Sequence, residues 1–147
     1  MANTDVTATY ADRQYPLVAV IDFDFSTFTE DTTYDVLQLP AGAIITGLAL
    51  QVKTAWDNTT PVLSVGLTST AVTEFLSAVA LDAEANFPVG LYSADDDANL
   101  FTADANIVTV ADTIELLYAA AAGTATAGAA TLTVEYVVSG RSNEISG

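Results

Sequence analysis

Histidine and cysteine are both absent from this 147-residue chain, and only three of its residues are basic. A chain without cysteine has no disulfide, no thiol nucleophile and no cysteine-type zinc site. A chain without histidine lacks the most common general acid or base of enzymes. These absences exclude most catalytic and metal-binding chemistry, and they predict a protein that is not an enzyme and holds no cofactor.

Basic residues are also scarce in this chain. Nineteen acidic residues face only Arg13, Lys53 and Arg141, which gives a formal net charge of −16. Lysine and arginine provide the affinity for nucleic-acid phosphates and for anionic lipids. The three basic residues are far apart in the sequence, so we expect neither nucleic acid nor membrane as a partner. High negative charge favours solubility and suits docking onto a basic surface.

Long apolar runs are missing as well. No stretch of about 20 apolar residues could span a bilayer. The first residues, MANTDV, have neither the basic nor the apolar region of a signal peptide. Half of the residues are nevertheless hydrophobic. At this length, folding buries about 70% of the surface of the unfolded chain, so we expect a full hydrophobic core.

Apolar residues alternate with polar ones along most of the chain, which predicts β-strands. The first strand places Leu17, Ala19, Ile21 and Phe23 on one face, with Asp22 and Asp24 on the other. The predicted strands are residues 17–25, 34–39, 43–55, 63–67, 87–92, 107–110, 114–118 and 131–138. The strands at 43–55 and 63–67 are expected to form a hairpin, because a short polar loop separates them.

One segment departs from this alternation. Val72, Phe75, Leu76 and Val79 have the spacing of an amphipathic helix, which predicts a short helical insertion over residues 71–82. About eight strands with one helix predict an all-β fold, an antiparallel β-sandwich of the jelly-roll type. An immunoglobulin-like sandwich is the alternative, although the Cys…Trp…Cys pattern of antibody-type domains is absent.

The two ends of the chain are polar and carry no core pattern. Residues 15–139 are therefore expected to form a single β-sandwich domain. Residues 1–14 are expected to be a flexible N-terminal arm, and residues 140–147 a C-terminal tail. Such ends can become ordered against a neighbour in an assembly.

Carboxylates offer two alternative kinds of site. Asp22 and Asp24 project from the same face of one strand, roughly 6–7 Å apart, near the spacing of the two carboxyls in glycosidases. Asp95–Asp97 could offer oxygen ligands to calcium, but the loop lacks the alternating spacing and closing glutamate of an EF-hand. Solvated surface carboxylates explain both groups more simply, so we predict no catalytic and no metal-binding residue.

Aromatic residues near strand ends and loops offer an alternative function. Tyr10, Trp56, Tyr92 and Phe101 could form a platform for glycans, as in many β-sandwich lectins. The same positions suit core caps or interface anchors.

Three stretches of the chain resemble a known group of proteins. They are YDVLQLPAGAIITGLALQV (34–52), AWDNTTPVLSVG (55–66) and GAATLTVEYVVSGRSNE (128–144). The order of aliphatic strand, Pro-Ala-Gly turn, aliphatic strand, tryptophan with a polar turn, and Pro-x-Leu-x-Val-Gly is similar to small β-sandwich capsid decoration (cement) proteins of tailed bacteriophages, and to related head or tail accessory proteins. These motifs are structural and contain no catalytic residue.

The resemblance implies a structural protein on the capsid surface of a virion. It implies a homotrimer that binds the major capsid protein and stabilises the shell by binding only its assembled form. The alternative is a tail- or head-fibre module that binds host glycans. The predicted interaction residues are Tyr10, Arg13, Lys53, Trp56 and Arg141. Outward aliphatic residues are expected to add subunit contacts; they are Ile45, Val62, Leu117 and Val137.

Overall fold

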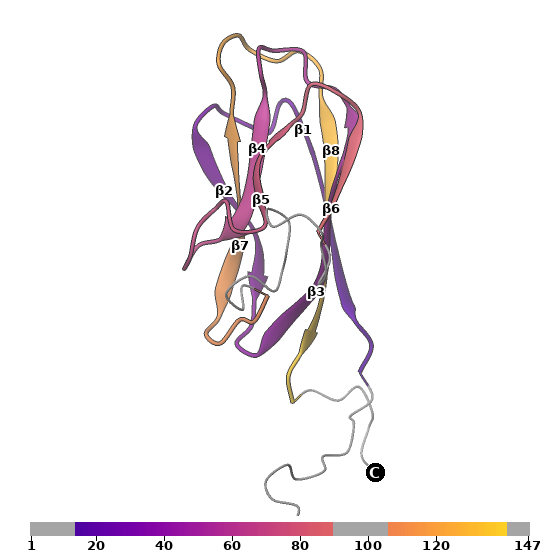
Figure 1. The fold of residues 1–147 in the computed structure, drawn as a ribbon, viewed down its shortest axis with the longest axis vertical. Coiled ribbons are helices and arrows are strands. Elements are labelled where there is room, and N and C mark those ends of the chain that lie inside the picture. Colours follow the sequence, from indigo (N-terminus) through magenta and orange to yellow (C-terminus); the bar gives the residue numbers. More distant parts are fainter. Residues whose placement is uncertain (1–13, 90–105, 141–147) are drawn as a thin grey trace, which may run out of the picture.

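Eight strands arranged in two sheets make up the computed structural model, which describes residues 14–89 and 106–140 (Figure 1). The strands are β1 (Leu17–Asp24), β2 (Thr32–Leu39), β3 (Ala43–Thr54), β4 (Val62–Leu67), β5 (Leu76–Ala80), β6 (Ala85–Val89), β7 (Asp112–Ala119) and β8 (Ala129–Val138). One sheet has the order β1-β8-β3-β6 and the other β2-β7-β4-β5. All of the strand pairs are antiparallel.

The strands pair in a nested pattern. The first strand pairs with the last, β2 with β7, β3 with β6, and β4 with β5. Contacts of β8 with β3 and of β7 with β4 then complete the two sheets. This is the arrangement of a long folded-over hairpin rolled into two layers, which is a jelly roll. The predicted fold class, an antiparallel β-sandwich, is confirmed.

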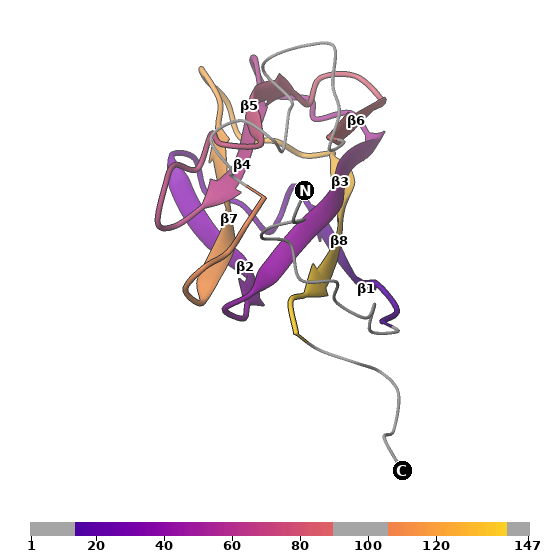
Figure 2. The same ribbon diagram turned by 60° about the horizontal axis from the view of Figure 1, so that its bottom comes forward.

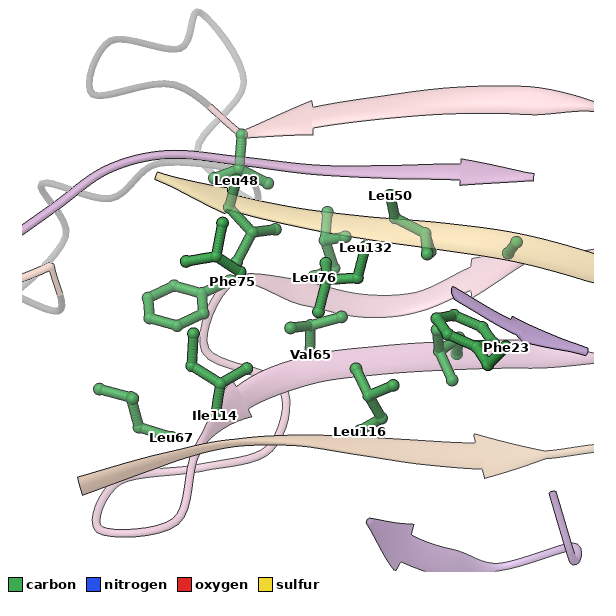
Figure 3. Close-up of a cluster of buried hydrophobic side chains, with 14 of the residues drawn as sticks. Phe23, Leu48, Leu50, Val65, Leu67, Phe75, Leu76, Ile114, Leu116 and Leu132 are labelled. Atoms are coloured by element: carbon green, nitrogen blue, oxygen red, sulfur yellow. The ribbon is translucent and has the colours of Figure 1, made fainter. Parts of the chain in front are cut away.

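The core lies between the two sheets and is built from the inward positions of the strands. Leu50 and Leu132 come from one sheet, and Val65 and Leu116 from the other; none of the four side chains is exposed to solvent. Figure 3 shows these side chains in the layer between the sheets. Burying one such aliphatic side chain stabilises the fold by about 1.5–3 kcal/mol. Alternation in the sequence therefore indicates which face of a regular strand points inward.

The predicted hairpin of residues 43–55 and 63–67 is wrong. Strand β3 lies between β8 and β6, whereas β4 lies in the other sheet, between β7 and β5. The connection between them crosses from one sheet to the other and covers the end of the core. Its residues Trp56 and Pro61 are buried for this reason.

The helix predicted over residues 71–82 is also wrong. The segment begins with turns and continues as β5, which pairs with β4. Leu76 and Val79 both turn towards the core although they are three residues apart, because Ala78 between them has a left-handed backbone (φ 48°). Phe75 is fully buried just before the strand. An irregular strand thus reproduced the spacing of a helix.

Four further local differences concern strand bounds and the exposure of side chains. Residues 107–110 form no strand; Ile107 makes only an isolated bridge with Ile44. A β-bulge between Ile45 and Gly47 reverses the inside and outside of β3 at that point. Ile45 is consequently buried in the core, and its predicted exposure is wrong. The other outward aliphatics, Val62, Leu117 and Val137, are partly buried. The strand predicted from residue 87 begins earlier, as β6, and residues 90–92 lie outside the described part.

Candidate interaction surface

The outer face of the β1-β8-β3-β6 sheet carries small and apolar side chains. We call it the valine face; it consists of Val18, Val20, Gly47, Ala49, Pro88 and Thr133, and the charged Glu135 of β8 lies within it, between Val18 and Gly47. These residues form rows across the sheet. One row runs from Val20 on β1 through Thr133 on β8 and Ala49 on β3 to Pro88 on β6. A shallow depression of about 320 Å³ lies in the middle of this face.

The two valines distinguish this face from an ordinary solvated one. Alternate residues of β1, including Ile21 and Phe23, point to the core, which leaves Val18 and Val20 outward, 56% and 62% exposed. Valine suits an extended backbone, but water-facing positions of a sheet are ordinarily polar. A contiguous exposed apolar patch marks an interaction surface.

Charged side chains border the valine face. The Nζ of Lys53 lies 2.9 Å from Oδ1 of Asp22, and the hydroxyl of Thr131 donates a hydrogen bond to the same oxygen. The Thr131 hydroxyl, together with the Lys53 ammonium, lowers the pKa of Asp22 below its ordinary value. Lys53, predicted as an interaction residue, thus lies on this face as half of an exposed ion pair, and such pairs add little stability.

The second carboxylate of β1 is held by the turn that follows the strand. The hydroxyl of Ser26 donates a 2.5 Å hydrogen bond to Oδ1 of Asp24, and the Ser26 backbone N–H donates another. These bonds lower the pKa of Asp24. A glycosidase needs one carboxyl with a raised pKa as its general acid. The pKa values of Asp22 and Asp24 are both shifted in the opposite direction.

Trp56 lies in the core and not on the surface. Only 2% of it is exposed, and its ring centroid is 6.4 Å from that of Phe23. The backbone of Gly128 packs directly on the indole, because a Cβ at this residue would lie 2.3 Å from Cδ2 of Trp56. The expectation that Trp56 contacts a partner or a glycan is therefore wrong. Its position between a strand and a polar turn was compatible with either placement.

Side-chain hydrogen bonds join the connections at one end of the sandwich, which we call the loop end (residues 25–31, 55–61 and 120–128). Oδ1 of Asp57 accepts a 2.7 Å bond from the backbone N–H of Thr126, and the Thr126 hydroxyl donates to Oδ2. This hydroxyl is the main cause of the lowered pKa of Asp57. Nδ2 of Asn58 donates to the Tyr118 hydroxyl at 2.7 Å. A groove of about 430 Å³ at this end is lined partly by Phe28, whose ring stacks on Tyr118.

The opposite end, which we call the terminal end (residues 14, 40–42, 106–111 and 139–140), collects both limits of the described chain (Figure 2). The side-chain amide of Gln14 donates to the backbone carbonyl of Val138 and accepts from its N–H. Backbone bonds link Gly42 to Val108 and to Ser139. Val110 is 74% exposed beside a groove of about 700 Å³.

Three of the predicted interaction residues, Tyr10, Arg13 and Arg141, lie outside the described residues. So do the aromatic candidates Tyr92 and Phe101 and the acidic loop Asp95–Asp97. Within residues 14–89 and 106–140, no three acidic side chains come together as a metal site. The same part of the chain contains no helix with the length and apolar character needed to cross a bilayer.

Comparison with solved structures gives the clearest relationship. A chain in the capsid asymmetric unit of cyanophage Pam1 is similar over 93% of this chain and 94% of its own, with a TM-score of 0.61 and 19% identity. A chain in the capsid of Ralstonia phage GP4 is similar over 93% of both, with a TM-score of 0.58 and 13% identity. One in the acid-stable capsid of Helicobacter pylori bacteriophage KHP30 matches 84% of this chain and 88% of its own, with a TM-score of 0.51 and 18% identity.

These proteins share a fold. At such identities the similarity extends to the arrangement of strands and not to particular residues. No protein-family model and no curated protein sequence matches this chain.

Proposed function

We propose that this chain is a structural protein of a tailed-bacteriophage virion. In this proposal it is a capsid decoration protein that binds the outside of the shell, contacts the major capsid protein and forms a homotrimer. The observation that carries the proposal is the fold, which matches chains in three phage capsid structures nearly from end to end. The proposal includes no enzymatic activity. The two carboxylates of β1, Asp22 and Asp24, accept hydrogen bonds from neighbouring side chains of the same chain.

The surface supports the same proposal. A decoration protein needs a rigid body, high solubility and a face that can dock. The nested sheets supply the body, the net charge of −16 the solubility, and the valine face an exposed apolar surface. A protein that binds only the assembled shell stabilises it by mass action.

The test is binding to empty shells assembled from the major capsid protein of the same phage. Full-length chain is mixed with shells and sedimented, and the shells are then heated. We expect the chain to co-sediment and to raise the temperature at which the shells come apart. Light scattering of the free chain is expected to give three times its 15.2 kDa mass. Absence of the chain from the shell pellet would contradict the decoration function, and a monomeric mass would contradict the trimer.

The N-terminal arm is tested in the same assay. Deletion of residues 1–14 is expected to weaken attachment to shells, with at most a small loss of thermal stability from the two hydrogen bonds between Gln14 and Val138. Deletion of residues 1–13, which keeps Gln14, is expected to weaken attachment equally and to leave thermal unfolding unchanged. Equal occupancy of truncated and full-length chain on shells would contradict this role.

A further inference from the structure

The two sheets end in four edge strands, and three of them carry features that discourage pairing with another strand. In β2 a register shift interrupts the ladder between Asp35 and Leu37. The five-residue β5 contains the left-handed Ala78, and the five-residue β6 contains Pro88, which lacks an N–H donor. Bulges, short strands, charges and prolines are the usual ways in which natural sheets protect an edge.

The fourth edge, β1, has no bulge and no proline, and its only charges are Asp22 and Asp24 at its C-terminal end. Its eight residues, LVAVIDFD, contain no proline, glycine or lysine. They pair with β8 without a register shift, from Leu17 opposite Tyr136 to Asp24 opposite Ala129. In an antiparallel ladder, every second residue directs its backbone N–H and C=O away from the neighbouring strand. No strand among the described residues pairs with these groups (Figure 2).

An unprotected edge and an exposed apolar face therefore coincide on the same strand. Val18 and Val20 border the free edge of β1 and also begin the rows of the valine face. A strand added beside β1 would satisfy the outward backbone groups and cover both valines in one step. This is the geometry of β-strand addition, in which backbone bonds give affinity and alternate side chains give specificity.

We propose that the free edge of β1 accepts an extended segment of a partner protein as a fifth strand. The segment carries apolar residues against Val18 and Val20 and lysine or arginine against Asp22 and Asp24. The inference rests on the proposed function in one respect, that the partner belongs to the shell.

Charge favours such a partner over a second copy of the chain. Strand β1 carries two carboxylates and no basic residue, and the whole chain carries a net charge of −16. A parallel, in-register pair of β1 strands would place like charges directly opposite one another, which destabilises a sheet. An antiparallel pair would bring four carboxylates into the seam with no basic residue of β1 to balance them. A basic, apolar segment provides opposite charges at the same positions.

Amide hydrogen exchange on the full-length chain tests the edge directly. Exchange is measured on the free chain at two concentrations and on the chain bound to empty shells. We expect the outward amides of β1 to exchange rapidly in the free chain at both concentrations and to slow by about tenfold or more on shells. The edge amides of β2 serve as the internal control and are expected not to change.

If the edge of β1 is covered by another segment of the same chain or by a second copy, the exchange results differ, and either outcome would overturn the proposal. Protection of β1 in the dilute free chain would assign the edge to another segment of the same chain. Protection that grows with concentration would assign it to a second copy. Bound chain without protection of β1 would overturn the inference alone, whereas failure to bind shells at all would overturn the proposed function.

Substitutions test the face. Val20→Glu is expected to weaken shell binding by about tenfold or more, because it places an unpaired carboxylate in the contact. Thr33→Glu is the matched control, because Thr33 is an exposed, outward residue of β2, an edge strand of the other sheet. Val110→Glu tests whether the terminal end contacts the shell. Both are expected to bind as wild type, and all three to melt as wild type. Loss of binding in Val110→Glu with normal binding in Val20→Glu would overturn the proposal.

Discussion

The two ends of the sandwich are built differently. At the loop end, side chains hold the connections together: Asp57 binds Thr126, Asn58 binds Tyr118, and Trp56 lies beneath Gly128. At the terminal end, backbone bonds link Gly42 to its neighbours, the Gln14 side chain binds the backbone of Val138, and the apolar Val110 projects into solvent. The terminal end exposes more apolar surface, since Ile107 and Val110 are 46% and 74% exposed, against 37% for Phe25 at the loop end. The difference predicts that substitutions at the loop end cost more stability than substitutions at the terminal end.

The largest expected effect comes from Trp56→Ala. Removing the buried indole leaves a cavity at the loop end, and we expect the free energy of unfolding to fall by about 3–5 kcal/mol. Denaturation by urea, followed by circular dichroism, measures this loss. Val110→Ala at the terminal end is the control and should change stability by less than about 0.5 kcal/mol. Comparable losses of unfolding free energy in the two variants would show that the two ends contribute equally to stability.

A smaller effect is expected from Gly128→Ala. The new Cβ would overlap the Trp56 ring, and such overpacking costs about 1–3 kcal/mol. Gly123→Ala is the matched control: it also has a positive φ (+87°, against +147° at Gly128), but its Cβ would meet nothing closer than 3.8 Å. Thermal melts of the two variants separate the steric contact from backbone strain. Equal losses would mean that Trp56 does not require the glycine.

The smallest effect, and the one that depends on pH, is expected from Asp57→Ala. Because the hydrogen bond from Thr126 lowers the pKa of Asp57 in the folded chain, the charged carboxylate stabilises the fold. This contribution is complete above the unfolded pKa of about 3.9 and disappears as the pH falls through the lower folded value. The stability gap between wild type and variant should therefore be present at neutral pH and close in acid.

Urea denaturation at a series of pH values measures that gap. Thr126→Val, which removes the donor hydroxyl, should show the same closing gap. A gap that persists or widens in acid would mean that the Asp57 carboxylate contributes nothing through its charge.

Regular strands could be predicted from the sequence, because alternation alone determines them. The edge strand β1 and the central strand β8 were predicted with the correct inward faces. Irregular backbone could not be predicted. The left-handed Ala78 imitated helical spacing, and the bulge at Ile45 turned an expected surface residue inward. Neither residue carries a side-chain signal for its conformation.

Sheet membership and the candidate surface needed three-dimensional information. Nothing in the sequence indicates that the chain crosses between sheets at Trp56, since a polar loop between two strands usually closes a hairpin. The valines of β1 could be assigned outward from alternation. That these valines share a face with Ala49 and Pro88 could not be predicted, because it depends on strand pairings between distant parts of the chain.

The nested pairing also has a consequence for how the chain reaches its native state. Strands β4 and β5 are close in sequence and can meet early, whereas β1 must wait for β8, the last strand to be synthesised. Contacts between distant residues form slowly because closing a long loop costs entropy. Strand β1 is thus expected to be secured late, and a chain that stops before residue 129 lacks β8, its neighbour among the described strands. If the edge of β1 accepts a partner strand as proposed, it is expected to do so as an ordered edge only after β8 has been synthesised.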